Sequence, residues 1–337
     1  MHLRRRERGI AIEASPRRPL GRTALDVFPL CLGGSVFGWT IAESESYEVL
    51  DAYMEAGGNF IDTADVYSAW APGNSGGESE RIIGRWMAAR GNREDVILAT
   101  KVGGLEGAQG LSARAIRTGI EGSLRRLGTN YVDLYYAHFD DDDTDQLETM
   151  RIFDGLVRDG TVRCLAVSNF TPARLASALD ISAREGLEGY AVSQAHYNLV
   201  HRDEYEGPLA ELCAERGIAC LPFRALGSGF LSGKYRRRDA VTGARAEQVS
   251  GYVNEAGFEV LDALDAIAER HRTSVSAVAL AWLMAQRTVV APVVGANSPA
   301  QLSDLLQSLE VELSDAELDS LRTVSDRMHH GRANSEA

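Results

Sequence analysis

The 337-residue sequence contains very little lysine. It has 33 arginines but only two lysines, Lys101 and Lys234. A coding bias that replaces lysine with arginine would explain the excess of arginine, but it does not explain which two lysines remain. Because the lysine ammonium is a compact point charge and the arginine guanidinium is a planar fork, we expect the two lysines to lie where an amine is required.

The sequence also lacks long apolar runs and paired cysteine motifs. No apolar run approaches the ~18 residues of a membrane span, and no apolar stretch follows the arginines at positions 4–6, as a secretory signal would require. The four cysteines form no CxxC motif; they are Cys31, Cys164, Cys213 and Cys220. We therefore expect a cytoplasmic protein with reduced cysteines and no membrane partner.

Acidic residues outnumber basic ones outside the N-terminus. The net charge is −13, and residues 1–22 hold seven arginines against two glutamates, so the remainder of the chain carries −18. An acidic body of this kind excludes a general nucleic-acid binder, which needs a basic face. We expect residues 1–22 to be a flexible basic arm, residues 23–330 a single folded domain, and residues 331–337 a tail.

Apolar strand-like runs alternate with helical patterns along the whole domain. One such helix is expected to begin after Ser112 and to end at Gly128. Eight strand–helix units favour an α/β fold, the (β/α)8 TIM barrel, with a long loop after strand seven at about residues 227–258. The expected strands cover residues 27–34, 60–64, 96–102, 132–138, 162–168, 192–197, 219–226 and 289–295.

Polar residues stand at the ends of the expected strands, where barrel enzymes carry their active sites. An ammonium lowers the pKa of a nearby phenol, which is about 10 in isolation, and an imidazole can donate a hydrogen bond to a substrate oxygen. Such a group could protonate a carbonyl oxygen while hydride arrives from a nicotinamide cofactor. The residues concerned are Asp62, Tyr67, Lys101, His138, Ser168, Asn169 and Gln194.

Five ordered motifs resemble those of the aldo-keto reductase family, in particular its bacterial members related to potassium-channel β subunits. They are GGNFIDTADVY at 57–67, ATKV at 99–102, YYAH at 135–138, VSNF at 167–170 and QAHYNL at 194–199. The resemblance implies an NAD(P)H-dependent carbonyl reductase. In it, Tyr67 is the general acid, Lys101 lowers the pKa of Tyr67, Asp62 pairs with Lys101, and His138 orients the substrate carbonyl.

The resemblance also implies where the cofactor binds. Ser168, Asn169 and Gln194 match positions that hold the nicotinamide carboxamide, and Phe223 replaces a stacking tyrosine. The other expected positions are Gly33, Gly34, Ser35, Asp62, Arg224, Leu226, Gly229, Lys234, Gly295, Asn297 and Gln301.

The sequence has no basic residue at the position that usually distinguishes NADPH from NADH. Many relatives have a basic residue at or beside Asn297 to bind a 2′-phosphate, and here Arg224 or the arginines at 236–238 would have to supply that charge. We expect NADPH, with NADH as the alternative.

Aromatic residues in the loops after the strands are expected to line a pocket for a small-molecule carbonyl substrate: Trp39, Trp70 and Phe139. We expect no metal site, because neither the acidic run at 140–143 nor the histidines show ligand spacing. The sequence does not decide between a monomer and a homo-oligomer. One alternative function is a cofactor-binding sensor subunit with little turnover, resembling channel β subunits. Another is a metal-dependent barrel isomerase or hydrolase, against which the Tyr67 and Lys101 pair argues.

Overall fold

The computed structural model describes residues 17–237 and 246–333, with the side chains of 329–333 left out. The expected tail residues 334–337, most of the expected N-terminal arm and Arg238 lie outside the described residues.

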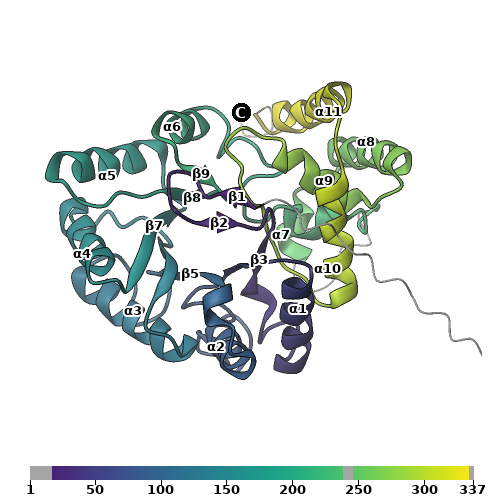
Figure 1. Ribbon diagram of the computed structural model, residues 1–337. Helices are drawn as coiled ribbons and strands as arrows, with labels where there is room; N and C mark the ends of the chain where they lie inside the picture. The colour runs from purple at the N-terminus through teal and green to yellow at the C-terminus, as the bar shows by residue number, and fades with distance from the viewer. Residues whose placement is uncertain (1–16, 238–245, 334–337) are drawn as a thin grey trace, which may run out of the picture.

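Eight parallel strands form the centre of the molecule (Figure 1). The sheet closes between its first and last strands, because Val290 N donates to Cys220 O at 3.0 Å and Val293 N donates to Pro222 O at 2.8 Å. The predicted (β/α)8 barrel is therefore confirmed. In spatial order the strands are β10 (Val293–Val294), β3 (Cys31–Gly33), β4 (Phe60–Asp62), β5 (Ile97–Val102), β6 (Val132–Ala137), β7 (Val162–Ser168), β8 (Val192–Gln194) and β9 (Ala219–Cys220).

Helices surround the barrel, and several begin and end at the residues that the sequence indicates. Ser112 caps one helix by accepting a hydrogen bond from Ala115 N at 3.3 Å, and Gly128 ends it in the left-handed conformation at φ 66°. The helices are α1 (Glu43–Glu55), α2 (Glu78–Arg90), α3 (Ala113–Leu127), α4 (Gln146–Arg158), α5 (Pro172–Glu185), α6 (Pro208–Arg216), α7 (Ala246–Ser250), α8 (Glu255–His271), α9 (Val275–Met284), α10 (Pro299–Leu306) and α11 (Asp315–Ala333). None of the helices in the described ranges is long and apolar enough to cross a membrane.

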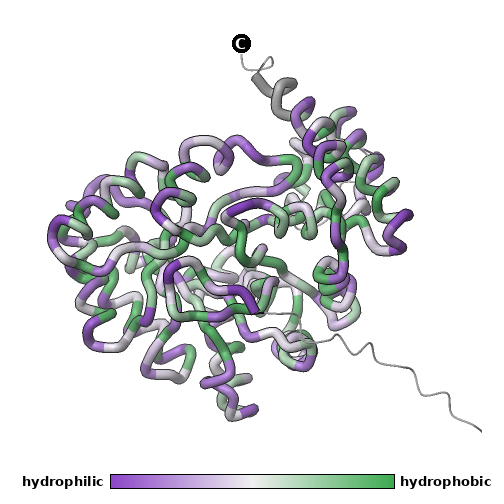
Figure 2. Tube along the Cα trace, turned by 45° about the horizontal axis from the view of Figure 1, so that its top comes forward, coloured by the Kyte–Doolittle hydropathy of each residue, from purple (hydrophilic) through white to green (hydrophobic). Residues whose placement is uncertain are grey.

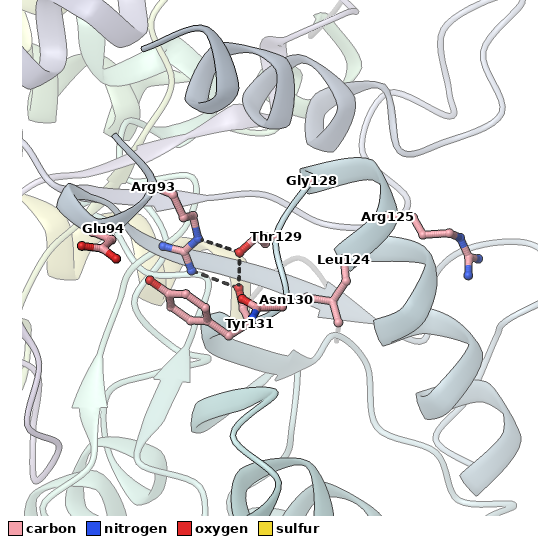
Figure 3. A pocket seen from close by; sticks show the side chains of 8 residues that line it. All are labelled: Arg93, Glu94, Leu124, Arg125, Gly128, Thr129, Asn130 and Tyr131. Atoms are coloured by element: carbon pink, nitrogen blue, oxygen red, sulfur yellow. Dashed lines mark hydrogen bonds between the residues drawn. The ribbon is translucent and has the colours of Figure 1, made fainter. Parts of the chain in front are cut away.

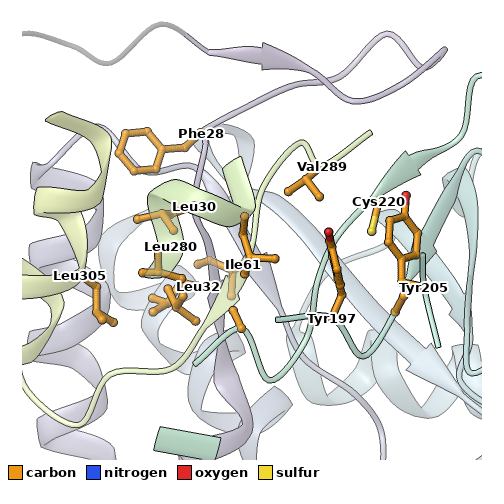
Figure 4. Close-up of a cluster of buried hydrophobic side chains, with 14 of the residues drawn as sticks. Phe28, Leu30, Leu32, Ile61, Tyr197, Tyr205, Cys220, Leu280, Val289 and Leu305 are labelled. Atoms are coloured by element: carbon orange, nitrogen blue, oxygen red, sulfur yellow. The ribbon is translucent and has the colours of Figure 1, made fainter. Parts of the chain in front are cut away.

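The apolar core has two parts, because successive side chains of a strand point to opposite faces. One part fills the barrel interior and includes Phe60, Ala99 and Leu134. The other packs the outer face of the sheet against the helices, as Leu32, Ile61 and other side chains show in Figure 4. Hydrophobic segments accordingly run through the middle of the molecule, and hydrophilic segments are frequent on its outside (Figure 2).

A hairpin covers the end of the barrel at which the strands begin. Strand β1 (Arg18–Pro19) pairs antiparallel with β2 (Asp26–Val27), and Leu20 between them is fully buried in the interior cluster. Arg22 donates to Tyr190 O at 3.0 Å. The prediction that the flexible arm extends to residue 22 is therefore wrong for residues 17–22. The buried side chains of Leu20 and Val27 close the floor of the barrel.

Candidate active site

Three predicted catalytic residues meet at the open end of the barrel. Lys101 Nζ donates to Asp62 Oδ2 at 2.6 Å, to Tyr67 OH at 2.9 Å and to Thr63 O at 2.9 Å. Tyr67 OH in turn donates to Asp62 Oδ2 at 3.3 Å. Both charged side chains are buried, Lys101 with 0% and Asp62 with 1% exposure. The three donor hydrogens of the ammonium are thus satisfied by three oxygens.

Strand alternation puts these groups inside the barrel. On β5, Leu98 and Val102 point outward to the helices, whereas Ala99 belongs to the interior cluster. Lys101 lies two residues beyond Ala99, so it shares the interior face. Asp62 follows Phe60 on β4 in the same way. These two residues therefore meet although they are far apart in the sequence.

Two opposing influences act on the pKa of Tyr67. Burial, and then the negative charge of Asp62, raise the pKa of the Tyr67 phenol well above its ordinary value. The ammonium of Lys101, 2.9 Å from the phenol oxygen, favours the phenolate and so acts in the direction that we predicted for it. The prediction concerned this cation alone and did not include the effect of burial. The phenol is held protonated, the form that can donate a proton.

His138 lies beside Tyr67 as a neutral imidazole. Burial, and then the charge of Lys101, lower the pKa of His138 well below its ordinary value. Its ring meets the Tyr67 ring edge-on, with centroids 6.1 Å apart, and stacks on Phe139 at 4.4 Å. A neutral imidazole keeps one N–H donor, so His138 can still donate a hydrogen bond to a substrate oxygen.

The three residues expected at the nicotinamide carboxamide contact one another and two of the predicted catalytic residues. Gln194 Nε2 donates to Asp62 Oδ1 at 2.9 Å, and Ser168 Oγ donates to Gln194 O at 3.0 Å. Asn169 Nδ2 donates to His138 O at 2.9 Å and to Ser168 Oγ at 3.2 Å. Asn169 adopts a left-handed φ of 57°, a conformation that asparagine tolerates better than most residues. The structure thus brings this predicted set together.

Aromatic side chains border the catalytic group on its solvent side. Trp39 and Trp70 pack edge to face at 5.5 Å, and Trp70 lies 6.0 Å from the Tyr67 ring. Trp70 and Phe139 are 49% and 46% exposed, the large hydrophobic side chains most open to solvent in the described ranges. Exposed apolar side chains grouped around a polar centre are typical of a ligand-binding wall, as predicted for these three residues.

The predicted pyrophosphate loop forms a short 3-10 element, η3 (Gly227–Ser232), with left-handed residues at its centre. Ser228 has φ 56° and Gly229 has φ 99°. A Cβ atom at Gly229 would lie 3.3 Å from Lys234 Nζ, so the second lysine lies against this loop. Successive backbone amides in such a conformation make a cradle for an anion. The donor set of amides and one amine fits the pyrophosphate of a dinucleotide.

Phe223 and Arg224 lie in the segment between the end of β9 and this loop. The Phe223 ring stacks on His196 with centroids 5.3 Å apart, and Arg224 takes a left-handed φ of 49°. Asn198 Nδ2 holds the Arg224 backbone by donating to its carbonyl oxygen at 2.9 Å. Leu226 begins the turn into η3 as its N-terminal flanking residue.

The expected adenosine end gathers at the start of α10. Asn297 N donates to Gln301 Oε1 at 2.7 Å, and Thr40 Oγ1 donates to Asn297 Oδ1 at 2.8 Å. Arg236 is paired in two bonds with Asp265 of α8, at 2.6 and 2.8 Å. Any 2′-phosphate contact by Arg236 would therefore compete with this ion pair.

Gly33 and Gly34 lie at the start of the 3-10 element η1 (Gly34–Val36) and have different surroundings. A Cβ atom at Gly34 would lie 2.6 Å from Ser79 Oγ, and Ser79 Oγ donates to Gly34 O at 2.8 Å. Gly34 therefore lets α2 approach the barrel closely. A Cβ atom at Gly295 would lie 3.6 Å from Gly33 O, so these two segments are neighbours at the mouth. Ser35, within η1, is partly exposed.

The acidic run after His138 serves the loop in which it lies. Asp140 forms two bonds with Arg174, at 2.6 and 2.9 Å, and Asp141 Oδ2 accepts hydrogen bonds from Leu111 N and Thr144 Oγ1, both at 2.7 Å. Asp140 and Asp141 thus tie the loop to α5 and to the β5–α3 connection.

Two further features were missed from the sequence. A surface pocket of about 580 Å³ lies at the opposite end of the barrel, where β5 and β6 begin. Arg93 spans it by donating to Thr129 and Tyr131, and none of its lining residues belongs to the predicted site (Figure 3). The second feature is a group formed by His196, His201 and Glu204 that could hold a metal ion, where we expected no ligands.

Comparison with known proteins agrees with this arrangement. The family description "Aldo/keto reductase family" matches residues 29–326. The chain is 33% identical to norsolorinic acid reductase of Aspergillus flavus over 310 residues, covering 87% of this chain and 76% of that protein. It is 32% identical to an aryl-alcohol dehydrogenase of Pestalotiopsis microspora over 323 residues, covering 89% and 81% respectively.

A bacterial relative is similar over almost its whole length. The chain is 33% identical to the oxidoreductase YrpG of Bacillus subtilis over 316 residues, covering 91% of this chain and 94% of that protein. The region matched by the family description, residues 29–326, contains every strand of the barrel and the four predicted catalytic residues, Asp62, Tyr67, Lys101 and His138. The protein therefore belongs to the aldo/keto reductase family of oxidoreductases.

Proposed function

We propose that this protein reduces an aldehyde or ketone to the alcohol, with Tyr67 as the proton donor. The observation that supports this most strongly is the Tyr67 hydroxyl held between Lys101 Nζ at 2.9 Å and Asp62 Oδ2 at 3.3 Å. After the phenol gives up its proton, the ammonium stabilises the phenolate that is left. The buried Asp62 carboxylate keeps the ammonium charged and fixed in place.

A nicotinamide cofactor supplies the hydride when it is bound. The residues that would hold it are Ser168, Asn169 and Gln194 at the carboxamide and Phe223 at the ring, with η3 and Lys234 at the pyrophosphate. Each amide side chain has an oxygen and two N–H groups, so internal hydrogen bonds leave capacity for a ligand. His138 then directs the substrate carbonyl toward Tyr67.

We propose that the preferred cofactor is NADPH, with NADH as the alternative. Lys234, in the predicted pyrophosphate loop, and Arg224, just before that loop, are both exposed. Arg236 would have to leave Asp265 to bind a 2′-phosphate. Titration of each nucleotide by quenching of tryptophan fluorescence tests this assignment. Tighter binding of NADPH supports it, and a weaker Kd for NADPH than for NADH contradicts it.

The substrate class that we propose is an aromatic carbonyl compound, reduced in the cytoplasm. Trp39, Trp70 and Phe139 offer flat apolar surfaces around the proton donor. The names of two relatives, norsolorinic acid reductase and aryl-alcohol dehydrogenase, point in the same direction for those proteins. Ring surfaces of this kind favour an aryl group over an alkyl chain of similar size.

The test is oxidation of NADPH or NADH by the purified protein with a matched panel of benzaldehydes and alkyl aldehydes. We expect turnover that survives chelation of metal ions and favours the aryl compounds, with the preference reduced by Trp70→Ala. Binding of a nucleotide without turnover of any carbonyl would contradict the proposal and favour the sensor-subunit alternative. Activity that chelation abolishes would favour metal-dependent chemistry.

A further inference from the structure

His196, His201 and Glu204 converge on one point beside the barrel mouth. Their ligand atoms all lie within 4.8 Å of one another. His201 Nε2 is 2.8 Å from Glu204 Oε1, and His196 Nδ1 is 3.9 Å from the same oxygen. We propose that these three side chains bind a divalent first-row transition ion, with Zn²⁺ as the representative case.

A tight turn creates the site. His196 stands two residues after the end of β8, and Asn198 and His201 exchange two backbone hydrogen bonds of 3.0 Å each. The turn carries His201 back over His196, so that their rings stack with centroids 3.6 Å apart. Glu204 lies three residues further on, before α6. The spacing in sequence, five residues and then three, hides this convergence.

The chemistry of the donors selects the class of ion. Two imidazoles and one carboxylate are the protein ligands of open, three-ligand zinc sites, in which water takes the fourth position. Imidazole nitrogen suits zinc, copper and nickel, whereas magnesium and calcium prefer oxygen ligands. With neutral imidazoles the group carries one negative charge, so a cation is electrostatically favoured.

The surroundings support ligation by His196 through Nδ1. Its other ring nitrogen, Nε2, is 3.5 Å from Tyr252 OH, and a metal-bound histidine usually donates its second N–H to an oxygen. Arg202, within the same turn, is committed to Glu206 at 2.7 Å and to Asp326 at 2.6 Å. The neighbouring cation is therefore neutralised by two acids of its own.

Binding requires a small rearrangement. Zinc bonds of about 2.0–2.2 Å are shorter than the present spacing, and the ion must lie in the plane of each ring, so the stacked rings have to tilt apart. Glu204 can close on the ion because its side chain is 59% exposed. His196 also stacks on Phe223 at 5.3 Å. If the proposed cofactor pocket is correct, a bound ion would therefore act on the ring that faces the nicotinamide.

Calorimetric titration of Zn²⁺ into chelator-treated full-length protein tests the site without any cofactor. His329 and His330, whose side chains are not among those described, are replaced by alanine in every sample, so that this adjacent pair cannot contribute to the measured zinc binding. We expect one ion per chain. His201→Ala and Glu204→Gln should each weaken binding at least about tenfold, and Tyr252→Phe should weaken it by roughly 10–100-fold through loss of the outer hydrogen bond.

The control is His271→Ala, which removes another histidine–glutamate pair, with Glu317 at 3.1 Å, that has no third ligand among the described residues. It should leave zinc affinity unchanged. Glu204→Gln alters an exposed side chain, so it keeps the test valid even if a histidine variant unfolds. No binding, or binding that Glu204→Gln leaves intact, would overturn the proposal and leave a simple histidine–glutamate ion pair. Because no turnover is measured, failure here is distinct from failure of the proposed reductase activity.

Discussion

At the scale of single residues, the proposed chemistry depends most on Lys101. Its ammonium contacts three oxygens within 2.9 Å and is completely enclosed. A guanidinium is larger and planar and presents its donors in a fixed fork, so it cannot reproduce these contacts in the same space. The scarcity of lysine in the sequence is therefore informative at position 101. At Lys234, which is exposed, an arginine could offer a similar charge to a phosphate.

Lys101→Arg should therefore lower kcat/KM for carbonyl reduction by roughly 10²–10⁴, the usual contribution of a positioned acid or base. Lys234→Arg is the matched control and should change kcat/KM much less, with its effect confined to cofactor affinity. Steady-state kinetics and nucleotide titrations on both variants measure this. Near-normal activity of Lys101→Arg would show that an amine is not required.

A second prediction at this scale concerns Asp65, which is fully buried and has no hydrogen-bond partner for its carboxylate in the described part of the chain. Burial, and then the charge of Glu80, raise the pKa of Asp65 to about 7. The folded state therefore binds this proton more tightly than the unfolded state, in which the pKa is about 4. By linkage, this stabilisation is complete below pH 4 and is lost as the pH rises to about 7.

Asp65→Asn removes this titration while keeping the size of the side chain. Relative to the variant, the wild type should lose a free energy of unfolding of about 4 kcal/mol between pH 4 and pH 8, at about 1.4 kcal/mol per pKa unit. Denaturant unfolding at a series of pH values gives both curves. Parallel curves over that interval would mean that Asp65 titrates normally.

At the scale of elements, the loop between β6 and α4 connects the catalytic group to the substrate wall. It carries His138 and Phe139, and the next residue, Asp140, is clamped by Arg174 of α5 in two bonds. Arg174 also donates to Asp141 O at 3.1 Å. The clamp thus fixes the position of an exposed ring that borders the site.

Arg174→Lys keeps the charge but loses the two-bond geometry. We expect KM for an aromatic aldehyde to rise several-fold with kcat little changed, because Phe139 moves while Tyr67 and Lys101 stay in place. The free energy of unfolding should fall by no more than about 1 kcal/mol, as for other partly exposed ion pairs. Arg151→Lys, at the exposed pair with Glu185, is the control. An unchanged KM would show that the loop does not need the clamp.

Local patterns predict some elements better than others. Helix caps such as Ser112 and Gly128 could be predicted because each depends on neighbouring residues. Strand ends were predicted less well: the strand expected over residues 219–226 is limited to Ala219–Cys220, and the one expected over 289–295 to Val293–Val294. The meeting of Asp62 and Lys101 followed from the barrel topology. The hairpin at residues 18–27 and the His196–His201 stack could not be predicted, since the hairpin strands have two residues each and the stack depends on one turn. The rise that burial causes in the pKa of Tyr67 could not be predicted, because burial is not visible in a sequence.

At the scale of the whole molecule, the two ends of the barrel have different roles. The β1–β2 hairpin covers the end at which the strands begin (Figure 1). The predicted catalytic residues lie at the end where the strands finish, with Lys101 near the end of β5 and Asp62 at the end of β4. Leu20 and Val27, both fully buried, connect the hairpin to the interior cluster. Stability of the floor and chemistry at the mouth are thus separated by the length of the barrel.

Leu20→Ala should accordingly cost about 2–5 kcal/mol of unfolding free energy, the usual range for a buried leucine, while kcat/KM at a permissive temperature stays close to that of the wild type. Leu25→Ala, at a half-buried position of the same hairpin, should cost less. Denaturant unfolding and kinetics on the same samples separate the two effects. A large loss of activity in folded Leu20→Ala protein would mean that floor and mouth are coupled.

The Tyr67 hydroxyl is the proposed source of the proton in carbonyl reduction. The most direct test of this role is the single-turnover rate of NADPH oxidation by benzaldehyde in wild type and Tyr67→Phe, with nucleotide affinity measured separately. The phenylalanine variant keeps the ring and loses only the hydroxyl held by Lys101 and Asp62. We predict a rate lower by about 10²–10⁴ with an unchanged Kd for the nucleotide. Equal single-turnover rates in the two proteins would contradict the account.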